Sequence, residues 1–204
     1  MNLITREERK VKSARIYTND LNRIIASTKY FVSDSNSTKC YQYIKLEFCS
    51  AENRVVAIAV DGYRMSVEHS VISDCDEDFM VFIKSNIRIP KKQYATISLA
   101  EDGEEAIIRC NGFSFGFSQP ESNNFDWKKA IPTSDILYRI GFNGNYLLSA
   151  LQAAKASLGD SFRHPVVLEF RSSLEPIVLR TNEEDIKMVL PVRLEKNTED
   201  TLKN

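Results

Sequence analysis

The chain has 204 residues, of which 43% are hydrophobic, and its formal net charge at pH 7 is −1. This composition excludes a disordered chain, and the length is enough for one large or two small domains with real cores. A net charge so close to zero gives little long-range attraction to nucleic acid. Any contact with DNA would therefore come from local clusters of Lys and Arg.

The cysteines and the N-terminal sequence limit the possible chemistry and location. The four cysteines are widely spaced without a CxxC pair, and the chain has two histidines, so we expect no metal site, no cofactor and no disulfide framework. The first residues lack the apolar segment of a signal peptide, and no apolar run approaches the length of a membrane span. These features predict a cytoplasmic protein with reduced thiols and no membrane contact.

The first part of the chain predicts one strand, one helix and three further strands. Ala14–Tyr17 is the opening strand, and Asn19-Asp20 is the expected N-cap of a helix whose Leu21, Ile24 and Ile25 share one face. Three strands are then expected over residues 41–48, 54–60 and 63–69. The pattern is βαβββ.

A second unit is expected after the acidic linker over residues 73–78. Its strands are predicted over residues 79–84, 95–99, 106–110 and 113–117. The place of its helix is occupied by a segment in which Pro90 would break a helix in mid-course. At most one helical turn is expected there.

The third unit again predicts βαβββ. It has a strand over 138–142, a helix that starts after an Asn143 N-cap, and strands over 166–170, 176–180 and 185–194. The apolar stripe of this helix is Tyr146, Leu147, Ala150, Leu151 and Ala154. A unit of about 55 to 60 residues thus recurs three times, which favours an array over an enzyme core.

Four segments, in order along the chain, resemble the bacterial sliding clamp family, the β subunit of DNA polymerase III. They are the run Val55–Val67 with its Asp61-Gly62 turn, the run Asn124–Pro132, the run Gly141–Leu151 and the run Met188–Leu194. The resemblance implies an α+β, DNA-clamp-like fold of repeated βαβββ half-domains, with antiparallel sheets and few helices. It also implies a structural role for Trp127, for which a core position is favoured over a nucleic-acid patch.

The resemblance also implies a domain organisation and an assembly. Residues 1–12 would be an N-terminal arm, 13–132 a domain like the clamp's middle domain, 133–194 a half-domain like the end of its last domain, and 195–204 a disordered tail. No counterpart of the family's first domain is recognised. Because three half-domains per chain would need four chains to supply the twelve units of a clamp ring, we expect a homo-oligomer.

Carried over residue by residue, the family's peptide pocket would be apolar with one cationic rim. It would take short extended peptides of DNA polymerases or clamp loaders, with Met65, Met188 and Leu190 as a deformable floor and Arg64 as a hydrogen-bond donor. Its residues would be Val60, Asp61, Gly62, Tyr63, Arg64, Met65, Pro132, Met188, Leu190, Pro191, Val192 and Arg193. Without the resemblance, Asp61-Gly62 is an ordinary two-residue hairpin turn, and Met188, Leu190 and Val192 alternate as core residues of a half-buried strand.

Two functions from different classes follow. The first is a sliding-clamp-like replication accessory, and the alternative is an adaptor or decoy that competes for clamp-binding peptides without encircling DNA. Contact with duplex DNA is expected to be weak, non-specific and salt-sensitive, through Arg23, Lys29, Lys155 and Arg163. No nucleophile-base pair or phosphate-binding loop is present in the sequence, so we expect no catalytic residues and no enzyme.

Overall fold

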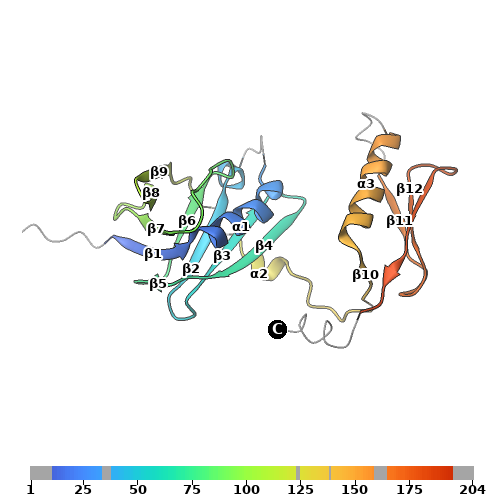
Figure 1. Cartoon of the computed structure of the whole chain (residues 1–204), viewed down its shortest axis with the longest axis horizontal. Coiled ribbons are helices and arrows are strands. Elements are labelled where there is room, and N and C mark those ends of the chain that lie inside the picture. The colour runs from blue at the N-terminus through green and yellow to red at the C-terminus, as the bar shows by residue number, and fades with distance from the viewer. Residues whose placement is uncertain (1–10, 34–37, 123–124, 138, 159–164, 195–204) are drawn as a thin grey trace, which may run out of the picture. The chain divides into compact units, whose positions relative to one another are not determined.

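The computed structural model describes residues 11–33, 38–122, 125–137, 139–158 and 165–194. The chain divides into two units, residues 1–131 (unit 1) and residues 132–204 (unit 2), which are considered separately. Every strand pairing is antiparallel, and helices are few (Figure 1). The α+β class with antiparallel sheets is therefore confirmed.

Unit 1 contains two sheets, with strand orders β4-β3-β2-β6 and β5-β1-β7-β8-β9. Its elements are β1 (Lys12–Tyr17), α1 (Thr18–Thr28), β2 (Ile44–Cys49), β3 (Arg54–Val60), β4 (Met65–Val71), β5 (Asp74–Cys75), β6 (Phe79–Ile83), β7 (Tyr94–Leu99), β8 (Glu105–Cys110), β9 (Phe113–Ser118) and α2 (Trp127–Ala130). Two short 3-10 helices, Lys29–Phe31 and Lys39–Gln42, lie between α1 and β2. The expected strands are thus present, with shifts at some ends.

The two halves of unit 1 exchange their opening strands. Strand β1 of the first half pairs with β7 of the second, with Ile16 opposite Ala95. Strand β6 of the second half pairs with β2 of the first, with Ile83 opposite Ile44. Each sheet therefore contains strands of both halves, so that neither half has a complete sheet of its own.

The core of unit 1 lies where both sheets and α1 contribute apolar side chains. The predicted helix face is confirmed, because Leu21 and Ile24 are fully buried and Ile25 is nearly so. Burial of each such side chain stabilises the fold by about 1.5–3 kcal/mol. The predicted N-cap is wrong: the helix begins at Thr18, and the Asn19 carboxamide oxygen instead accepts a hydrogen bond from the Lys92 N–H (3.0 Å).

Three local expectations in unit 1 have clear outcomes. Tyr41 lies in a 3-10 helix, so the strand predicted over 41–48 begins only at Ile44. The acidic segment over 73–78 is more than a linker, because it contains β5, which pairs with β1. The expectation of at most one helical turn in the second half is confirmed, since the described residues 84–93, which include Pro90, contain no helix.

Unit 2 contains β10 (Gly141–Phe142), α3 (Gly144–Leu158), β11 (Val167–Glu169), β12 (Ile177–Arg180), β13 (Ile186–Val189) and β14 (Pro191–Val192). Strands β11, β12 and β13 form one sheet, and β10 pairs with β14. The Asn143 N-cap is confirmed, because its side-chain oxygen accepts a hydrogen bond from the Asn145 N–H (3.0 Å). The strand predicted over 185–194 is interrupted at Leu190, just before Pro191.

The core of unit 2 is small. It is built on Ile177, Leu179 and Val189, against which Phe142, Ala150 and Val166 pack. The predicted helix stripe is only partly correct, because Ala154 is buried whereas Tyr146 is 67% and Leu151 38% exposed. The predicted arm, except Val11 and Lys12, and the predicted tail lie outside the described residues.

Candidate functional site

The connection between β3 and β4 is a four-residue loop, Asp61–Arg64. Val60 and Met65 are paired on the two strands, and the Asp61 N–H donates to the Arg64 carbonyl oxygen (3.3 Å). Gly62 has φ +94°, which a residue with a side chain rarely adopts. The two-residue hairpin turn is therefore wrong for this segment, and Tyr63 and Arg64 precede the strand instead of opening it.

The Asp61 carboxylate organises this loop. Its Oδ1 accepts hydrogen bonds from the N–H groups of Tyr63 (3.0 Å) and Arg64 (3.1 Å), and its Oδ2 accepts one from Arg64 Nε (2.7 Å). The bond from the Arg64 guanidinium, followed by the Tyr63 N–H, holds the pKa of Asp61 below its ordinary value. The carboxylate thus fixes both the loop and the direction of the arginine.

The loop presents an aromatic ring, a cation and an apolar side chain within three consecutive residues. Tyr63 is fully exposed, and the Arg64 side chain is 58% exposed with its guanidinium 5.5 Å from the centre of the Phe31 ring. Met65 is half-buried against a cluster formed by Val56, Ile58 and Trp127. The core position predicted for Trp127 is confirmed, and its Nε1 donates to Glu47 Oε2 (3.1 Å).

A small apolar cavity lies beside Val60. It measures about 20 Å³ and is lined mainly by aromatic and aliphatic side chains, which include Tyr41, Tyr43 and Phe125. These three aromatic residues were not assigned to the site from the sequence. Phe125 could have been suspected because it immediately precedes the Asp126-Trp127 pair, whereas the 3-10 helix that places Tyr41 gives no periodic signal.

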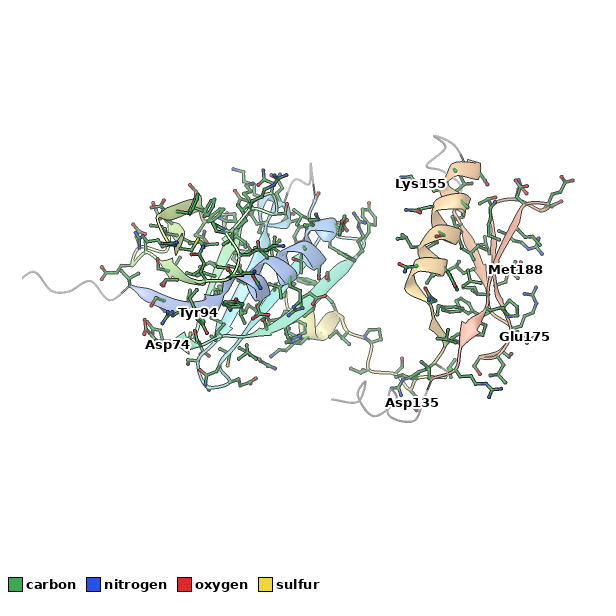
Figure 2. All side chains as sticks on the ribbon, viewed as in Figure 1. Asp74, Tyr94, Asp135, Lys155, Glu175 and Met188 are labelled. Atoms are coloured by element: carbon green, nitrogen blue, oxygen red, sulfur yellow. The ribbon has the colours of Figure 1, made fainter. Side chains whose placement is uncertain are left out.

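The last two strands of unit 2 expose a row of apolar side chains. Met188, Leu190 and Val192 are 62%, 69% and 47% exposed, while Val189 between them is buried in the core. Figure 2 shows Met188 on the side of the sheet away from α3. The core role expected for this alternation in the absence of the resemblance is therefore wrong, because the buried side of the strand is the other one.

Three further predicted residues, Pro191, Arg193 and Pro132, belong to unit 2. Pro191 is paired with Phe142, Arg193 is exposed, and Pro132 is exposed at the start of the unit. A hollow of about 540 Å³ runs beside Pro191 and Val192, and it is also lined by Arg139, Leu174 and Arg193. Arg139 and Leu174 were missed in the sequence, where each is a single residue without a repeating pattern.

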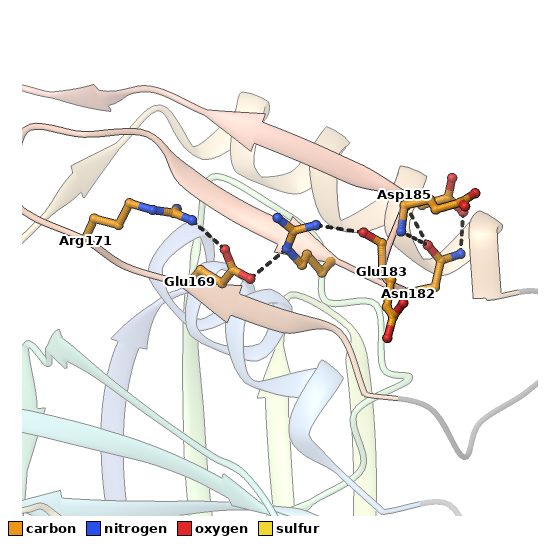
Figure 3. A network of polar contacts seen from close by, with 7 residues as sticks. Glu169, Arg171, Asn182, Glu183 and Asp185 are labelled. Atoms are coloured by element: carbon orange, nitrogen blue, oxygen red, sulfur yellow. Dashed lines mark hydrogen bonds and ion pairs between the residues drawn. The ribbon is translucent and has the colours of Figure 1, made fainter.

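The outer face of the unit 2 sheet carries a polar network. Glu169 accepts hydrogen bonds from Arg180 Nε (2.7 Å) and Arg171 (2.8 Å), and Arg180 also donates to the Glu183 carbonyl oxygen (Figure 3). The Arg180 guanidinium, and next the Arg171 guanidinium, lower the pKa of Glu169. This network links β11 to β12 on this face of the sheet.

The cations expected to contact DNA have different environments. Arg23 forms an ion pair with Glu68 (3.1 Å) and donates to the His69 carbonyl oxygen, Lys29 lies over the Tyr30 ring, and Lys155 is exposed on α3. Arg163 lies outside the described residues.

A hollow of about 1030 Å³ borders α1. It is lined by Arg23 and Lys29 from the helix side and by Arg88 and Lys91 from the segment that replaces the second helix. Arg88 and Lys91 were not predicted from the sequence, although their position in the segment that replaces the second helix was a usable signal.

The described residues contain neither a candidate metal site nor a helix that could span a membrane. No group of three or more His, Cys, Asp or Glu side chains is arranged to hold a metal ion within the ranges that the structure describes. None of the described helices is long and apolar enough to cross a membrane.

Repeated βαβββ units that share antiparallel sheets define a protein of the DNA-clamp fold. Solved structures of bacterial sliding clamps share this fold with the chain, which confirms the resemblance to the β subunit of DNA polymerase III. No protein-family model and no curated protein sequence matches the chain.

Three solved structures illustrate the likeness. A putative DNA polymerase III β subunit from Eubacterium rectale has a TM-score of 0.74 at 15% identity, covering 94% of this chain and 53% of that one. The sliding clamp of Bacillus subtilis has a TM-score of 0.74 at 19% identity, covering 94% and 51%. The Helicobacter pylori β clamp bound to a DNA ligase peptide has a TM-score of 0.68 at 14% identity, covering 96% and 54%. The chain thus spans about half the length of these clamps.

Proposed function

We propose that the chain is a clamp-like replication accessory of the cytoplasm that binds short, extended peptides of polymerase or clamp-loader partners. The observation that carries this proposal is the apolar row Met188, Leu190 and Val192, whose side chains are 62%, 69% and 47% exposed, whereas Val189 in the same segment is buried. Exposed apolar side chains that gather in one place are typical of an interaction surface.

Unit 1 and unit 2 each offer contacts that suit such a peptide. The row in unit 2 offers unbranched and branched aliphatic groups, of which Met188 adapts its shape to Leu or Phe anchors. The loop in unit 1 offers the exposed Tyr63 ring and the Arg64 guanidinium, which donates to peptide carbonyl or carboxylate oxygens. The loop is pre-organised by Asp61, so little conformational entropy is lost on binding.

The likeness to clamps supports peptide binding in general. The Helicobacter pylori clamp binds a DNA ligase peptide, and its fold covers 96% of this chain. The residues proposed to contact peptide are those that the resemblance assigned. In unit 1 they run from Val60 to Met65, and in unit 2 they are Pro132, Met188 and Leu190 to Arg193.

Peptide binding is tested by titrating a fluorescent peptide of the type Gln-Leu-x-Leu-Phe and measuring polarisation. We expect micromolar affinity, and we expect Leu190→Ala, Met188→Ala and Arg64→Ala each to weaken it about fivefold to tenfold, or roughly 1–1.4 kcal/mol. Leu148→Ala is the matched control, because Leu148 is an apolar residue of unit 2 with 54% exposure outside the proposed site. Unchanged affinity in all three variants would place the site elsewhere.

The alternative function, a decoy or adaptor that does not encircle DNA, is favoured by the engagement of Arg23. Its guanidinium is bound to Glu68 and to the His69 carbonyl oxygen, so one of the expected phosphate contacts is already occupied. Loading on nicked circular DNA separates the two functions. A tether is retained on the circle and lost when the DNA is linearised, whereas a decoy binds the peptide and is retained on neither.

A further inference from the structure

Unit 2 repeats the first half of unit 1 element by element. In the first half, β1 pairs with the short β5 that follows β4, and in unit 2, β10 pairs with the short β14 that follows β13. Each helix is followed by a three-stranded antiparallel meander, β2-β3-β4 or β11-β12-β13. Helix α1 contacts mainly the last strand of its meander, β4, and α3 contacts mainly β13.

The two copies differ in what occupies their free edges. In unit 1, the second edge of β1 is covered by β7 and the second edge of β2 by β6, both from the other half. In unit 2, within the described ranges, β10 has only β14 as a neighbour and β11 has only β12. Both positions at which unit 1 receives strands from its second half are therefore open in unit 2.

Apolar side chains are exposed at these open positions. Leu168 on β11 lies opposite Leu179 on β12, and Leu46 on β2 lies opposite Ala57 on β3. By this pairing, Leu168 and Phe170 of unit 2 correspond to Leu46 and Phe48 of unit 1. Leu168 and Phe170 are 43% and 44% exposed, whereas Leu46 and Phe48 are 0% and 3% exposed.

The helix shows the same difference. Leu147, Ala150, Leu151 and Ala154 have the spacing of Leu21, Ile24, Ile25 and Thr28. Leu151 is 38% exposed, and its counterpart Ile25 is 4% exposed. The side chains exposed on unit 2 are therefore equivalent to side chains that are buried in the complete pair of halves of unit 1.

We infer that unit 2 pairs with unit 2 of a second copy of the chain about a two-fold axis. Strand β10 of each copy pairs antiparallel with β11 of the other, which gives two five-stranded sheets of order β14-β10-β11-β12-β13, with the first two strands from one copy and the last three from the other. The contact is isologous, so a single two-fold operation fills both open edges of both copies. It also covers Leu151, Leu168 and Phe170. This inference does not depend on peptide binding.

The pairing register follows from unit 1. There, the last inward residue of each opening strand lies opposite the first inward residue of the receiving strand: Ile16 opposite Ala95, and Ile83 opposite Ile44. The equivalent pair is Phe142 of one copy and Val166 of the other. Three residues further along, Arg139 then lies opposite Glu169, so that the register brings opposite charges together.

The register is tested by disulfide cross-linking in the full chain with Arg139→Cys and Glu169→Cys combined. Residues directly opposite each other have Cβ atoms about 4.5–5.5 Å apart, close enough to form a disulfide after small adjustments. We expect a covalent dimer on mild oxidation, with the 139–169 link identified by mass spectrometry. The matched control combines Arg139→Cys with Arg171→Cys, since Arg171 lies two residues beyond Glu169, just past the end of β11. In an extended chain it is diagonal to Arg139 at roughly 7–8 Å and should link much less.

The assembly itself is tested by light scattering and by a disrupting variant. We expect a mass of at least twice the 23.3 kDa of the chain at about 50 µM, and Leu168→Glu is expected to shift the protein toward the monomer while far-ultraviolet circular dichroism stays unchanged. A wild-type monomer at that concentration overturns the inference. So does an oligomer in which 139 and 169 fail to link or the control pair links equally well, whether or not Leu168→Glu folds.

Discussion

Asp61 holds Arg64 in place: its Oδ2 lies 2.7 Å from Arg64 Nε, and its Oδ1 accepts the N–H groups of Tyr63 and Arg64. If the loop contacts peptide, its order is part of the affinity. We expect Asp61→Ala to lower the affinity for the fluorescent peptide by about threefold to tenfold, because the loop must then be ordered during binding.

A matched control for this variant is Asp102→Ala. Asp102 accepts the Glu104 N–H (3.0 Å) in another glycine-containing turn of the same unit, far from the proposed site in sequence. Its removal should leave peptide affinity unchanged. Equal losses in both variants would mean that the effect comes from general loosening of unit 1, and the loop would then have no special role in recognition.

Trp127 is expected to stabilise unit 1 and to take no part in DNA binding. Trp127→Phe removes the hydrogen bond to Glu47 and should cost about 1 kcal/mol of unfolding free energy, whereas Trp127→Ala also leaves a cavity and should cost about 3 kcal/mol. Urea unfolding followed by circular dichroism measures this. Tryptophan fluorescence cannot serve as the probe, because both variants remove the one tryptophan of the chain. Phe113→Ala, at a 56% exposed aromatic residue, should cost much less. Weaker DNA binding by a well-folded Trp127→Phe would contradict the structural role.

The sequence predicted local structure well where one continuous pattern fills an element. The strand Arg54–Val60 has the predicted bounds because its apolar run ends at turn residues on both sides. The exchange of β1 and β6 between the halves was not predicted, because pairing of distant strands leaves no trace in the local period. The interruption at Leu190 follows from Pro191, which lacks an N–H for the ladder.

The candidate site shows a similar limit. Alternation marked Met188, Leu190 and Val192 as one face of a strand, but the period is the same whichever face is buried. The resemblance to clamps selected these residues, and their exposure distinguishes a surface from a core. Arg88 and Lys91 were missed because no helical period marks a segment that replaces a helix.

Binding to duplex DNA is expected to be weak and to depend on salt. We expect more than half of it to be lost at about 0.3 M salt, and Lys91→Glu and Arg88→Glu each to weaken it equally for all sequences, with the salt slope reduced by about one per lost phosphate contact. Arg23→Ala should have a smaller effect, because its guanidinium is already paired with Glu68. Polarisation of labelled duplexes over a salt series measures this, and binding that is insensitive to salt would argue against phosphate contacts.

Glu169 is expected to titrate below the ordinary range of a glutamate, which makes its contribution to unit 2 sensitive to acid. Its folded-state pKa is lowered from 4.5, chiefly by Arg180 and then by Arg171. The unfolded chain therefore binds the proton more tightly, so the stabilisation is present above the unfolded pKa and is lost as the pH falls through the lower, folded pKa. Carbon-detected NMR of the Glu169 carboxyl should show a midpoint below 4.5. Arg180→Gln should move this midpoint upward more than Arg171→Gln does, because Arg180 is the larger cause. If both variants leave the midpoint unchanged, the network in Figure 3 does not control this carboxylate.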